Sequence, residues 1–240
     1  MRALVAAGAE VVIATDLRAD EIAAGERVVG RVLDVGDEAA TLALVTDVES
    51  TYGPIDLWFA NAGLTGGGGA DAPDEAWADQ WRVNVMAHVY AARALLPGWI
   101  ARGEGHLVTT SSMAGILTSL GDGVYAATKH AALGFSEWLA ITHADQGVKV
   151  SCVCPGGVDT PMLRGSVGDA DMAAAVIGAG EVLTADEAAA RIIAAVTEDV
   201  FLIYTHPELK VFVERKAADP DRWIRGMSRL WARGAALRGE

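Results

Sequence analysis

Residues 107–154 read LVTTSSMAGILTSLGDGVYAATKHAALGFSEWLAITHADQGVKVSCVC, and this stretch decides the fold. Residues 107–110 predict a buried strand, residues 125–144 a helix, and residues 148–154 a second strand that is almost wholly apolar. Strands that are joined through a long helical crossover run parallel. Because a parallel sheet is covered by helices on both faces, its strands need no polar side, and these two have almost none.

The same alternation of strand and helix continues on both sides of this stretch. Further strands are predicted at residues 11–14, 28–33, 55–59 and 200–204. Further helices are predicted at residues 2–8, 37–52, 74–101 with a break near Pro97, and 184–197, with Asp37 and Thr184 as N-caps. The pattern indicates an α/β fold with a doubly wound parallel sheet in three α/β/α layers. We expect one domain over residues 1–205 and a helical extension over residues 206–240.

Composition and charge exclude several classes of protein. Hydrophobic residues make up 52% of the 240 residues, which is typical of a globular chain with a sizeable core. The net charge of −13 argues against a nucleic-acid partner. Apolar stretches fall short of the ~20 residues that span a bilayer, and no signal peptide is recognised, so we expect a cytoplasmic protein without a membrane partner. Cys152 and Cys154 share one face of a strand and are expected to be reduced thiols, with no metal site.

The C-terminal segment differs in charge from the rest of the chain. Residues 206–240 carry eight Lys and Arg against five Asp and Glu. Trp223, Met227, Leu230 and Trp231 fall on one stripe of a predicted helix. We expect this helix to pack on the body of the protein or on a sister subunit; a helix lying on a membrane surface is the alternative.

Tyr125 and Lys129 are the first candidates for chemistry. They lie four residues apart on a predicted helix, so both side chains emerge on one face. A nearby ammonium favours the phenolate and lowers the pKa of a tyrosine, as a general acid–base catalyst requires. Ser112 follows a predicted strand, at the edge where open α/β sheets bind ligands. Asn84 is a polar amide within an apolar stretch of helix.

Five motifs stand in a fixed order: Asn61-Ala62-Gly63, Asn84, Ser112, Tyr125-Ala-Ala-Thr-Lys129 and Pro155-Gly156-Gly157-Val158-Asp159-Thr160. In this order and spacing they resemble the classical short-chain dehydrogenase/reductase family, over the chain from Met1 to about Tyr204. The resemblance implies a Rossmann-like fold that transfers a hydride between NAD(P) and a small-molecule alcohol or carbonyl compound. It also implies a homodimer or homotetramer, because family members pair through the helices that begin near Asp74 and Tyr125.

The resemblance further assigns a role to each motif. Tyr125 would exchange a proton with the substrate oxygen, and Ser112 would hold that oxygen. Lys129 would lower the pKa of the tyrosine and bind the nicotinamide ribose, and Asn84 would anchor a water that connects Lys129 to solvent. The cofactor would also lie against a longer set of residues: Asp34, Val35, Asn61, Ala62, Gly63, Pro155, Gly156, Val158 and Thr160.

Asp16 bears on the choice of cofactor. A carboxylate at the end of the second strand of this fold accepts the ribose hydroxyls of the adenosine and repels a 2′-phosphate, which favours NAD. NADP stays possible, because Asp16 falls one position later than the family's usual acid and Arg18 follows two residues on.

Three features depart from the family or invite another interpretation. Ala60 stands where the family has the first asparagine of Asn-Asn-Ala-Gly. The family's first strand and its Thr-Gly-x-x-x-Gly-x-Gly turn would stand just before Met1. We therefore expect the second and fourth strands to lack a shared neighbour and the diphosphate to lack its cradle, and we hypothesise that the natural chain begins about 25 residues upstream. The glycine run 66–69 is interpreted as a flexible loop beside the active site rather than a phosphate loop.

The function predicted from these residues is hydride transfer between NAD(P) and a hydrophobic secondary alcohol or ketone. The hydrophobic preference comes from residues 162–183, where the family places its substrate lid and where this chain is apolar. A 3-oxoacyl-carrier-protein reductase is one alternative. A catalytically silent binding protein is the other, because the phosphate-binding turn is missing.

Overall fold

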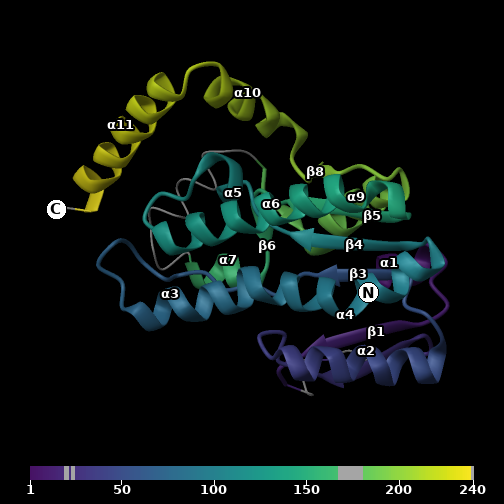
Figure 1. Cartoon of the computed structure of the whole chain (residues 1–240). Helices are drawn as coiled ribbons and strands as arrows, with labels where there is room; N and C mark the ends of the chain where they lie inside the picture. The colour runs from purple at the N-terminus through teal and green to yellow at the C-terminus, as the bar shows by residue number, and fades with distance from the viewer. Residues whose placement is uncertain (19–21, 23–24, 167–180, 239–240) are drawn as a thin grey trace.

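The computed structural model describes residues 1–18, 22, 25–166 and 181–238 (Figure 1). Its strands are β1 (Val12–Asp16), β2 (Val28–Val32), β3 (Leu57–Ala60), β4 (Gly105–Thr110), β5 (Val148–Cys154), β6 (Val158–Asp159), β7 (Leu183–Thr184) and β8 (Leu202–Tyr204). Its main helices are α1 (Arg2–Ala6), α2 (Glu38–Tyr52), α3 (Asp74–Trp81), α4 (Ala87–Arg102), α5 (Ala114–Leu117), α6 (Gly123–His143), α7 (Pro161–Ser166), α9 (Ala185–Thr197), α10 (Lys210–Ala218) and α11 (Pro220–Arg238). Three short helical turns are η2 (Arg82–Met86), η3 (Ala144–Gln146) and η4 (Pro207–Leu209).

The ladders between these named strands are all parallel, as the sequence predicts. Four strands form a sheet in the order β3-β4-β5-β8, and β1 pairs separately with β2. No ladder joins β1 to β3 within the residues that the structure describes. These two strands correspond to the second and fourth of the predicted sheet, and they have no common neighbour, as expected. Residues 57–59 of β3 are only partly buried, whereas every residue of β5 except Lys149 is buried.

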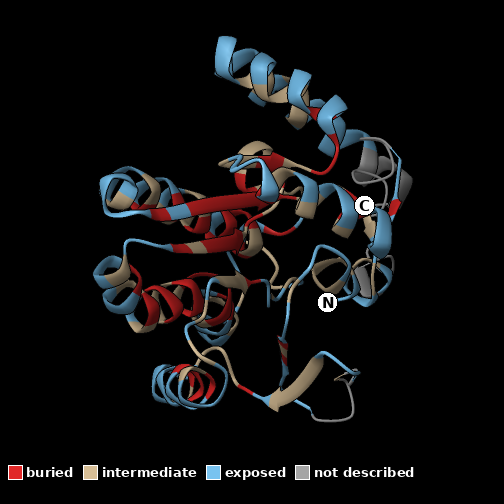
Figure 2. Ribbon diagram, turned by 90° about the vertical axis from the view of Figure 1, so that its right-hand side faces the viewer, coloured by how far each residue is buried: buried red, intermediate tan, exposed pale blue. Residues whose placement is uncertain are grey.

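Helices cover both faces of the four-stranded sheet. Along β4 the side chains alternate, so that Leu107 packs with Trp99 of α4 and Leu139 of α6, while Val108 packs with Val196 of α9. Figure 2 shows that the buried residues gather in these strands and on the sheet-facing sides of the helices. The three layers of the predicted fold are therefore present around β3, β4, β5 and β8.

Two helices begin where their capping residues predict. The carboxylate of Asp37 accepts a hydrogen bond of 3.0 Å from the backbone N–H of Ala40, and α2 ends before Gly53, which has φ 94°. Thr184 and Glu187 form a reciprocal capping box at the start of α9. Both caps are local, so the sequence alone specifies them.

Several predicted boundaries differ from the structure. Pro97 does not break its helix, because it lies on the exposed side of α4, where the carbonyl that its ring leaves unpaired faces water. The irregularity lies instead at the π-helical turn η2, which contains Asn84. The helix that carries Tyr125 begins two residues earlier than predicted, at Gly123, and the short helix α5 was not predicted.

The helical extension after β8 consists of α10 and α11, which lie on the α5 side of the molecule (Figure 1). Three residues of the predicted stripe, Trp223, Met227 and Trp231, line a groove of about 480 Å³ together with Leu117 and Leu120. The first helix of the extension, α10, contacts α5, and α11 contacts α10. The docking of the stripe on the body or on a sister subunit stays a prediction. No helix in the described ranges is both long and apolar enough to cross a bilayer.

Candidate active site

Parallel strands bring the predicted site residues to one edge of the fold, here called the carboxyl edge, formed by the C-terminal ends of β1 to β5. In Figure 1 the arrows of β1, β3 and β4 point to the same side. Asp16 ends β1, Asn61 follows β3, Ser112 follows β4 by two residues, and Pro155 follows β5. Ligands of open α/β sheets bind at this edge.

Tyr125, Ser112 and Lys129 meet at the carboxyl edge. Ser112 lies close enough to Tyr125 to lower the pKa of its phenol. The Nζ of Lys129 lies 5.6 Å from the centre of the Tyr125 ring and donates a hydrogen bond of 2.9 Å to the carbonyl of Thr110. The predicted Ser–Tyr–Lys set is therefore brought together by β4 and α6.

Burial dominates the electrostatics of these groups. It raises the pKa of the Tyr125 phenol, and the hydrogen bond from Ser112 opposes that rise only in part. Burial also lowers the pKa of Lys129 to about 8, against the raising influence of Cys152 and Cys154. The predicted lowering of the tyrosine pKa by Lys129 stays a prediction, because the influences seen on this pKa are burial, Ser112, Asp122 and Cys154.

Asn84 is fully buried, and its side chain binds other protein groups. Its Oδ1 accepts from the N–H of Leu64 at 2.8 Å, and its Nδ2 donates to the carbonyl of Leu64 at 3.0 Å and to the hydroxyl of Thr128 at 3.0 Å. The turn η2 points the amide inward to make these contacts. Asn84 thus fixes the segment after β3 against the helix that carries Tyr125 and Lys129.

Asp122 is a functional residue that the sequence analysis missed. Its buried carboxylate accepts from the N–H of Tyr125 at 3.0 Å and so caps α6. The same carboxylate accepts from the N–H of Gly66 at 2.7 Å and from the hydroxyl of Thr65 at 3.1 Å. The only sequence signal was an Asp one residue before the helix, in a cap position.

The glycine run 66–69 lies beside the active site, as predicted, but it is held in place. Gly66 and Gly68 have φ values of 80° and 86°, which favour glycine. A Cβ on Gly67 would lie 2.4 Å from the Nε2 of Gln80 and 2.8 Å from the Cβ of Val124. The glycine run therefore allows this segment to approach α6 closely. The hydrogen bond to Asp122 fixes Gly66, the first residue of the run.

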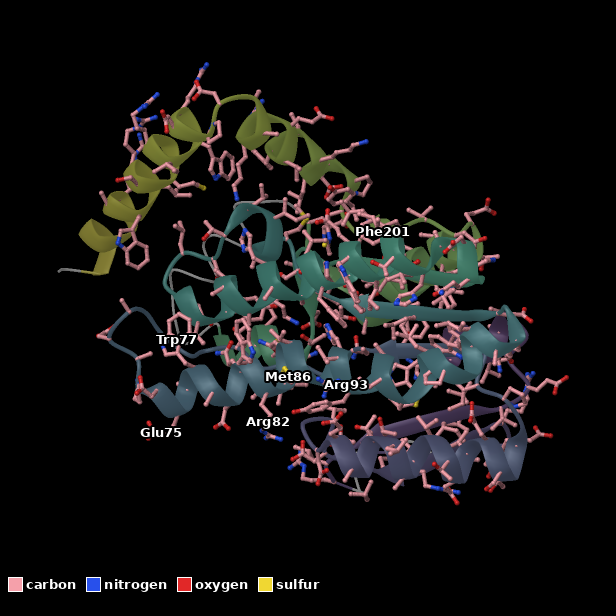
Figure 3. All side chains as sticks on the ribbon, in the orientation of Figure 1. Glu75, Trp77, Arg82, Met86, Arg93 and Phe201 are labelled. Atoms are coloured by element: carbon pink, nitrogen blue, oxygen red, sulfur yellow. The ribbon has the colours of Figure 1, made fainter. Side chains whose placement is uncertain are left out.

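Asp34 is paired with Arg82, a residue the sequence analysis did not single out. Both carboxylate oxygens of Asp34 lie 2.9 Å from the Nη1 of Arg82, and Oδ1 accepts from the N–H of Gly36 at 2.8 Å. Burial raises the pKa of Asp34, but these hydrogen bonds and the guanidinium charge together hold it below its usual range. Figure 3 shows Arg82 extending from the α3–α4 rod towards the layer that contains β1 and α2.

The other predicted cofactor residues lie along the carboxyl edge in two groups. Around the ends of β1, β2 and β3 lie Asp16, which is exposed, and Val35, Asn61, Ala62 and Gly63. After β5, Pro155 accepts from the N–H of Met113, the N–H of Gly156 points at His206, and Val158 lies in β6. Thr160 donates to the carbonyl of Val158 at 3.4 Å. Of the predicted lid, residues 167–180 lie outside the described part of the chain.

Cys152 and Cys154 are both free and buried in β5. Across the described ranges, no group of three or more His, Cys, Asp or Glu side chains could hold a metal ion.

The parallel sheet and its covering helices place the chain in the Rossmann class of α/β folds. A family model described as short chain dehydrogenase matches residues 1–170. The chain belongs to the short-chain dehydrogenase family.

Individual relatives agree with this assignment. The chain is 36% identical over 217 residues to 1-deoxy-11-beta-hydroxypentalenate dehydrogenase of Streptomyces avermitilis, covering 85% of this chain and 78% of that protein. It is 37% identical over 163 residues to 2-keto-3-deoxy-L-fuconate dehydrogenase of Xanthomonas campestris pv. campestris, covering 65% of this chain and 53% of that protein. The chain thus spans about half the length of some curated relatives it matches.

A solved structure confirms the fold. A short-chain dehydrogenase/reductase from Burkholderia phymatum, in complex with NAD, superposes with a TM-score of 0.81 at 27% identity. The superposition covers 92% of this chain and 89% of that one.

Proposed function

We propose that this chain carries an NAD-dependent oxidoreductase activity on CH–OH or C=O groups. The observation that carries the proposal is that Tyr125 has Ser112 close to its phenol and the ammonium of Lys129 5.6 Å from the centre of its ring. A carbonyl oxygen placed between the two hydroxyls would accept a hydrogen bond from each. An intact set of this kind has no evident use in a silent binding protein.

Each of these side chains has a defined part in the proposed reaction. In reduction, the Tyr125 hydroxyl donates its proton to the carbonyl oxygen as that oxygen gains charge, and in oxidation the phenolate takes the alcohol proton. Ser112 holds the same oxygen in place. The positive charge of Lys129 stabilises the phenolate, and this influence grows when a ligand excludes water from the site.

The residues at the carboxyl edge fit a dinucleotide at both of its ends. Gly63 gives the clearest support for this fit, because a Cβ at this position would lie 3.2 Å from Lys129 Nζ and 3.2 Å from Asn84 Oδ1. The missing side chain avoids a close contact with these two groups. Lys129 is buried, and it uses one of its three N–H donors on Thr110. Bound NAD would supply or accept the hydride at its nicotinamide ring.

Two groups of residues would hold this cofactor. Asp16 would accept the hydroxyls of the adenosine ribose, and Asp34 with Val35 would border the adenine. Asn61, Ala62 and Gly63 would lie along the cofactor, and Pro155, Gly156, Val158 and Thr160 would hold the nicotinamide end. The exposed carboxylate of Asp16 favours NAD over NADP, and the Burkholderia phymatum relative was solved with NAD.

The proposed substrate is a hydrophobic secondary alcohol or ketone. Support comes from the apolar side chains that flank the site after β5, Met162, Leu163 and Val182. The Streptomyces avermitilis relative is named for a hydroxypentalenate substrate. A cytoplasmic location is part of the same proposal, and the two free cysteines support it.

We further propose that two copies pair through α3, α4 and α6. The outer face of α3 and α4 carries a hollow of about 430 Å³ lined by Trp77, Trp81, Met86 and Tyr90. On α6, Trp138 is 55% and Ile141 80% exposed. Apolar surface of this extent is typical of a protein interface. The occupant is a second copy, because the family pairs through these same helices.

A thermal melt with saturating NAD, then NADP, then neither, tests the function. A ligand at 100 times its Kd adds about 2.7 kcal/mol to the free energy of unfolding, which raises the Tm by several degrees. We expect the rise with NAD and a smaller one with NADP. An Asp16→Ser variant should reduce the difference between the two. Absence of a rise with either dinucleotide, together with no turnover of secondary alcohols, would overturn the proposal.

A further inference from the structure

His88 is a buried polar residue to which the proposed mechanism gives no part. It is the second residue of α4 and is 1% exposed. Neither of its ring nitrogens has a hydrogen-bond partner within the described residues. Leaving a buried polar group unpaired costs ~1–3 kcal/mol, so such groups are rare in folded proteins. The nearby buried groups of Asn84 and Thr128 all have protein partners.

The position of His88 links it to the catalytic set. It follows Asn84 by four residues, across the π-helical turn η2, and both side chains are turned inward. The backbone of Ala60 lies beside its ring without reaching hydrogen-bonding geometry. Ala60 is the position where a side-chain amide of the family is replaced by a methyl group. A polar ring thus lies next to a site where a polar side chain is missing.

The ring of His88 is neutral and lies within the field of Lys129. Burial is the main cause that lowers the pKa of His88, and the Lys129 charge lowers it further, to about 3. A neutral imidazole has one nitrogen that accepts and one that donates a hydrogen bond. His88 can therefore act as an acceptor for a donor that comes from the direction of Lys129.

Lys129 has N–H donors that its hydrogen bond to Thr110 does not use. Its ammonium has three N–H groups, and its hydrogen bond to the carbonyl of Thr110 uses one of them. A Cβ on Gly63 would lie 3.2 Å from both Lys129 Nζ and Asn84 Oδ1. The ammonium therefore lies near the amide of Asn84, which is one helical turn before His88. The other titratable groups around this ammonium are Tyr125 and the thiols of Cys152 and Cys154.

We propose that His88 is a positioning residue for Lys129, and that its neutral imidazole and the Lys129 ammonium share one buried water. The ammonium donates to the water, and the water donates to the accepting nitrogen of His88. A buried water needs two to four polar partners, and Lys129, His88 and the backbone of Ala60 provide enough. The arrangement directs one N–H of Lys129 towards α4, so that the others point at Thr110 and at the cofactor side. The importance of this shared water for catalysis rests on the proposed function. The contact of Lys129 and His88 with the water is independent of it.

The proposal predicts a change in the protonation of Lys129 when His88 loses its nitrogens. A hydrogen bond to the charged form of a group stabilises that form. In His88→Leu the titration midpoint of Lys129 should fall, equivalent to about a tenfold loss of proton affinity. His88→Gln, which keeps an acceptor, should restore most of it. The matched control His106→Leu, at the far end of β4, should leave Lys129 unchanged.

NMR of protein labelled with ¹³C at the lysine ε-carbon measures this directly, because the chain has only four lysines and Lys129→Met identifies the signal. A folded His88→Leu protein with an unchanged Lys129 titration would overturn the proposal. Should that variant fail to fold, the ¹⁵N ring signals of His88 are compared between wild type and Lys129→Met; unchanged signals would overturn it equally. Neither measurement needs cofactor or turnover, so failure of the proposed function would be seen separately.

Discussion

The carboxylate of Asp122 accepts a hydrogen bond of 2.7 Å from the backbone N–H of Gly66, 56 positions earlier in the chain. The same carboxylate caps the helix of Tyr125. One buried side chain therefore fixes both the start of the catalytic helix and the glycine run that lies against it. The relative placement of Tyr125 and the segment after β3 depends on this residue.

The first prediction concerns Asp122→Ala. The substitution leaves the donors of Tyr125, Gly66 and Thr65 without their acceptor, and hydrogen bonds to charged groups contribute ~1.5–3 kcal/mol each. We expect the free energy of unfolding in urea to fall by about 3 kcal/mol. The matched control is Asp37→Ala, which removes an N-cap alone and should cost about 1 kcal/mol. Equal losses in the two variants would show that the tie to the glycine run contributes nothing.

Local signals explain which parts of the fold the sequence could predict. The caps of α2 and α9 are made by Asp37 and by Thr184 with Glu187, within three residues of the helix start. The turn η2 could not be predicted, because Asn84 acquires its partners from Leu64 and Thr128, 20 and 44 positions away. The predicted break at Pro97 failed because exposure, which the sequence does not give, decides whether a missing N–H matters.

The same division holds for the candidate site. Ser112, Tyr125 and Lys129 were predicted because they stand in motifs whose spacing is visible along the chain. Arg82 was missed, since its partner Asp34 is 48 positions away and only the tertiary fold brings them together. The burial that raises the pKa of Tyr125 could not be predicted for a related reason. The depth at which a phenol is buried depends on what packs over it, and no local pattern reveals that.

A second prediction concerns Gly115, where α5 approaches α6. A Cβ at this position would lie 2.3 Å from the hydroxyl oxygen of Ser111 and 2.5 Å from the backbone carbonyl oxygen of Lys129. Gly115→Ala should therefore destabilise the protein by ~1–3 kcal/mol and displace Lys129. Gly98→Ala is the matched control, because a Cβ there would meet nothing within 4 Å. As a helix-interior change it should stabilise by ~0.5–1 kcal/mol. Thermal melts of both variants give the comparison, and similar changes in the two would contradict the close approach.

A third prediction follows from the burial of Lys129. Its folded-state pKa is lowered to about 8, whereas an unfolded lysine titrates near 10.5. Between these values the unfolded chain binds more protons than the native one, so this group makes stability rise with pH across that window. Below pH 8 it destabilises the native state by about 3 kcal/mol. Lys129→Met, which lacks the charge, should be more stable than wild type at pH 7.5.

The measurement is urea unfolding of wild type and Lys129→Met at several pH values from 7.5 to 10.5. The difference in their free energies of unfolding should shrink as the pH rises, because the wild-type lysine loses its charge. Taking the difference cancels the titration of groups that both proteins share. A constant difference over this range would mean that Lys129 keeps an ordinary pKa in the folded protein.

The last prediction concerns the pairing of two copies through α3, α4 and α6. Trp81 is 45% and Ile141 80% exposed, and burying such side chains in a partner removes apolar area from water at ~25 cal/mol per Å². Arginine at either position would place a charge in the contact, which is costly unless it is paired. We expect wild type to elute as a dimer or tetramer in size-exclusion chromatography with light scattering, and Trp81→Arg and Ile141→Arg to elute as smaller species. Ile224→Arg, a matched change at a residue of α11 that is 63% exposed, should leave the assembly intact. A monomeric wild type would overturn the proposed pairing, and loss of assembly in Ile224→Arg alone would place the interface at α11 instead.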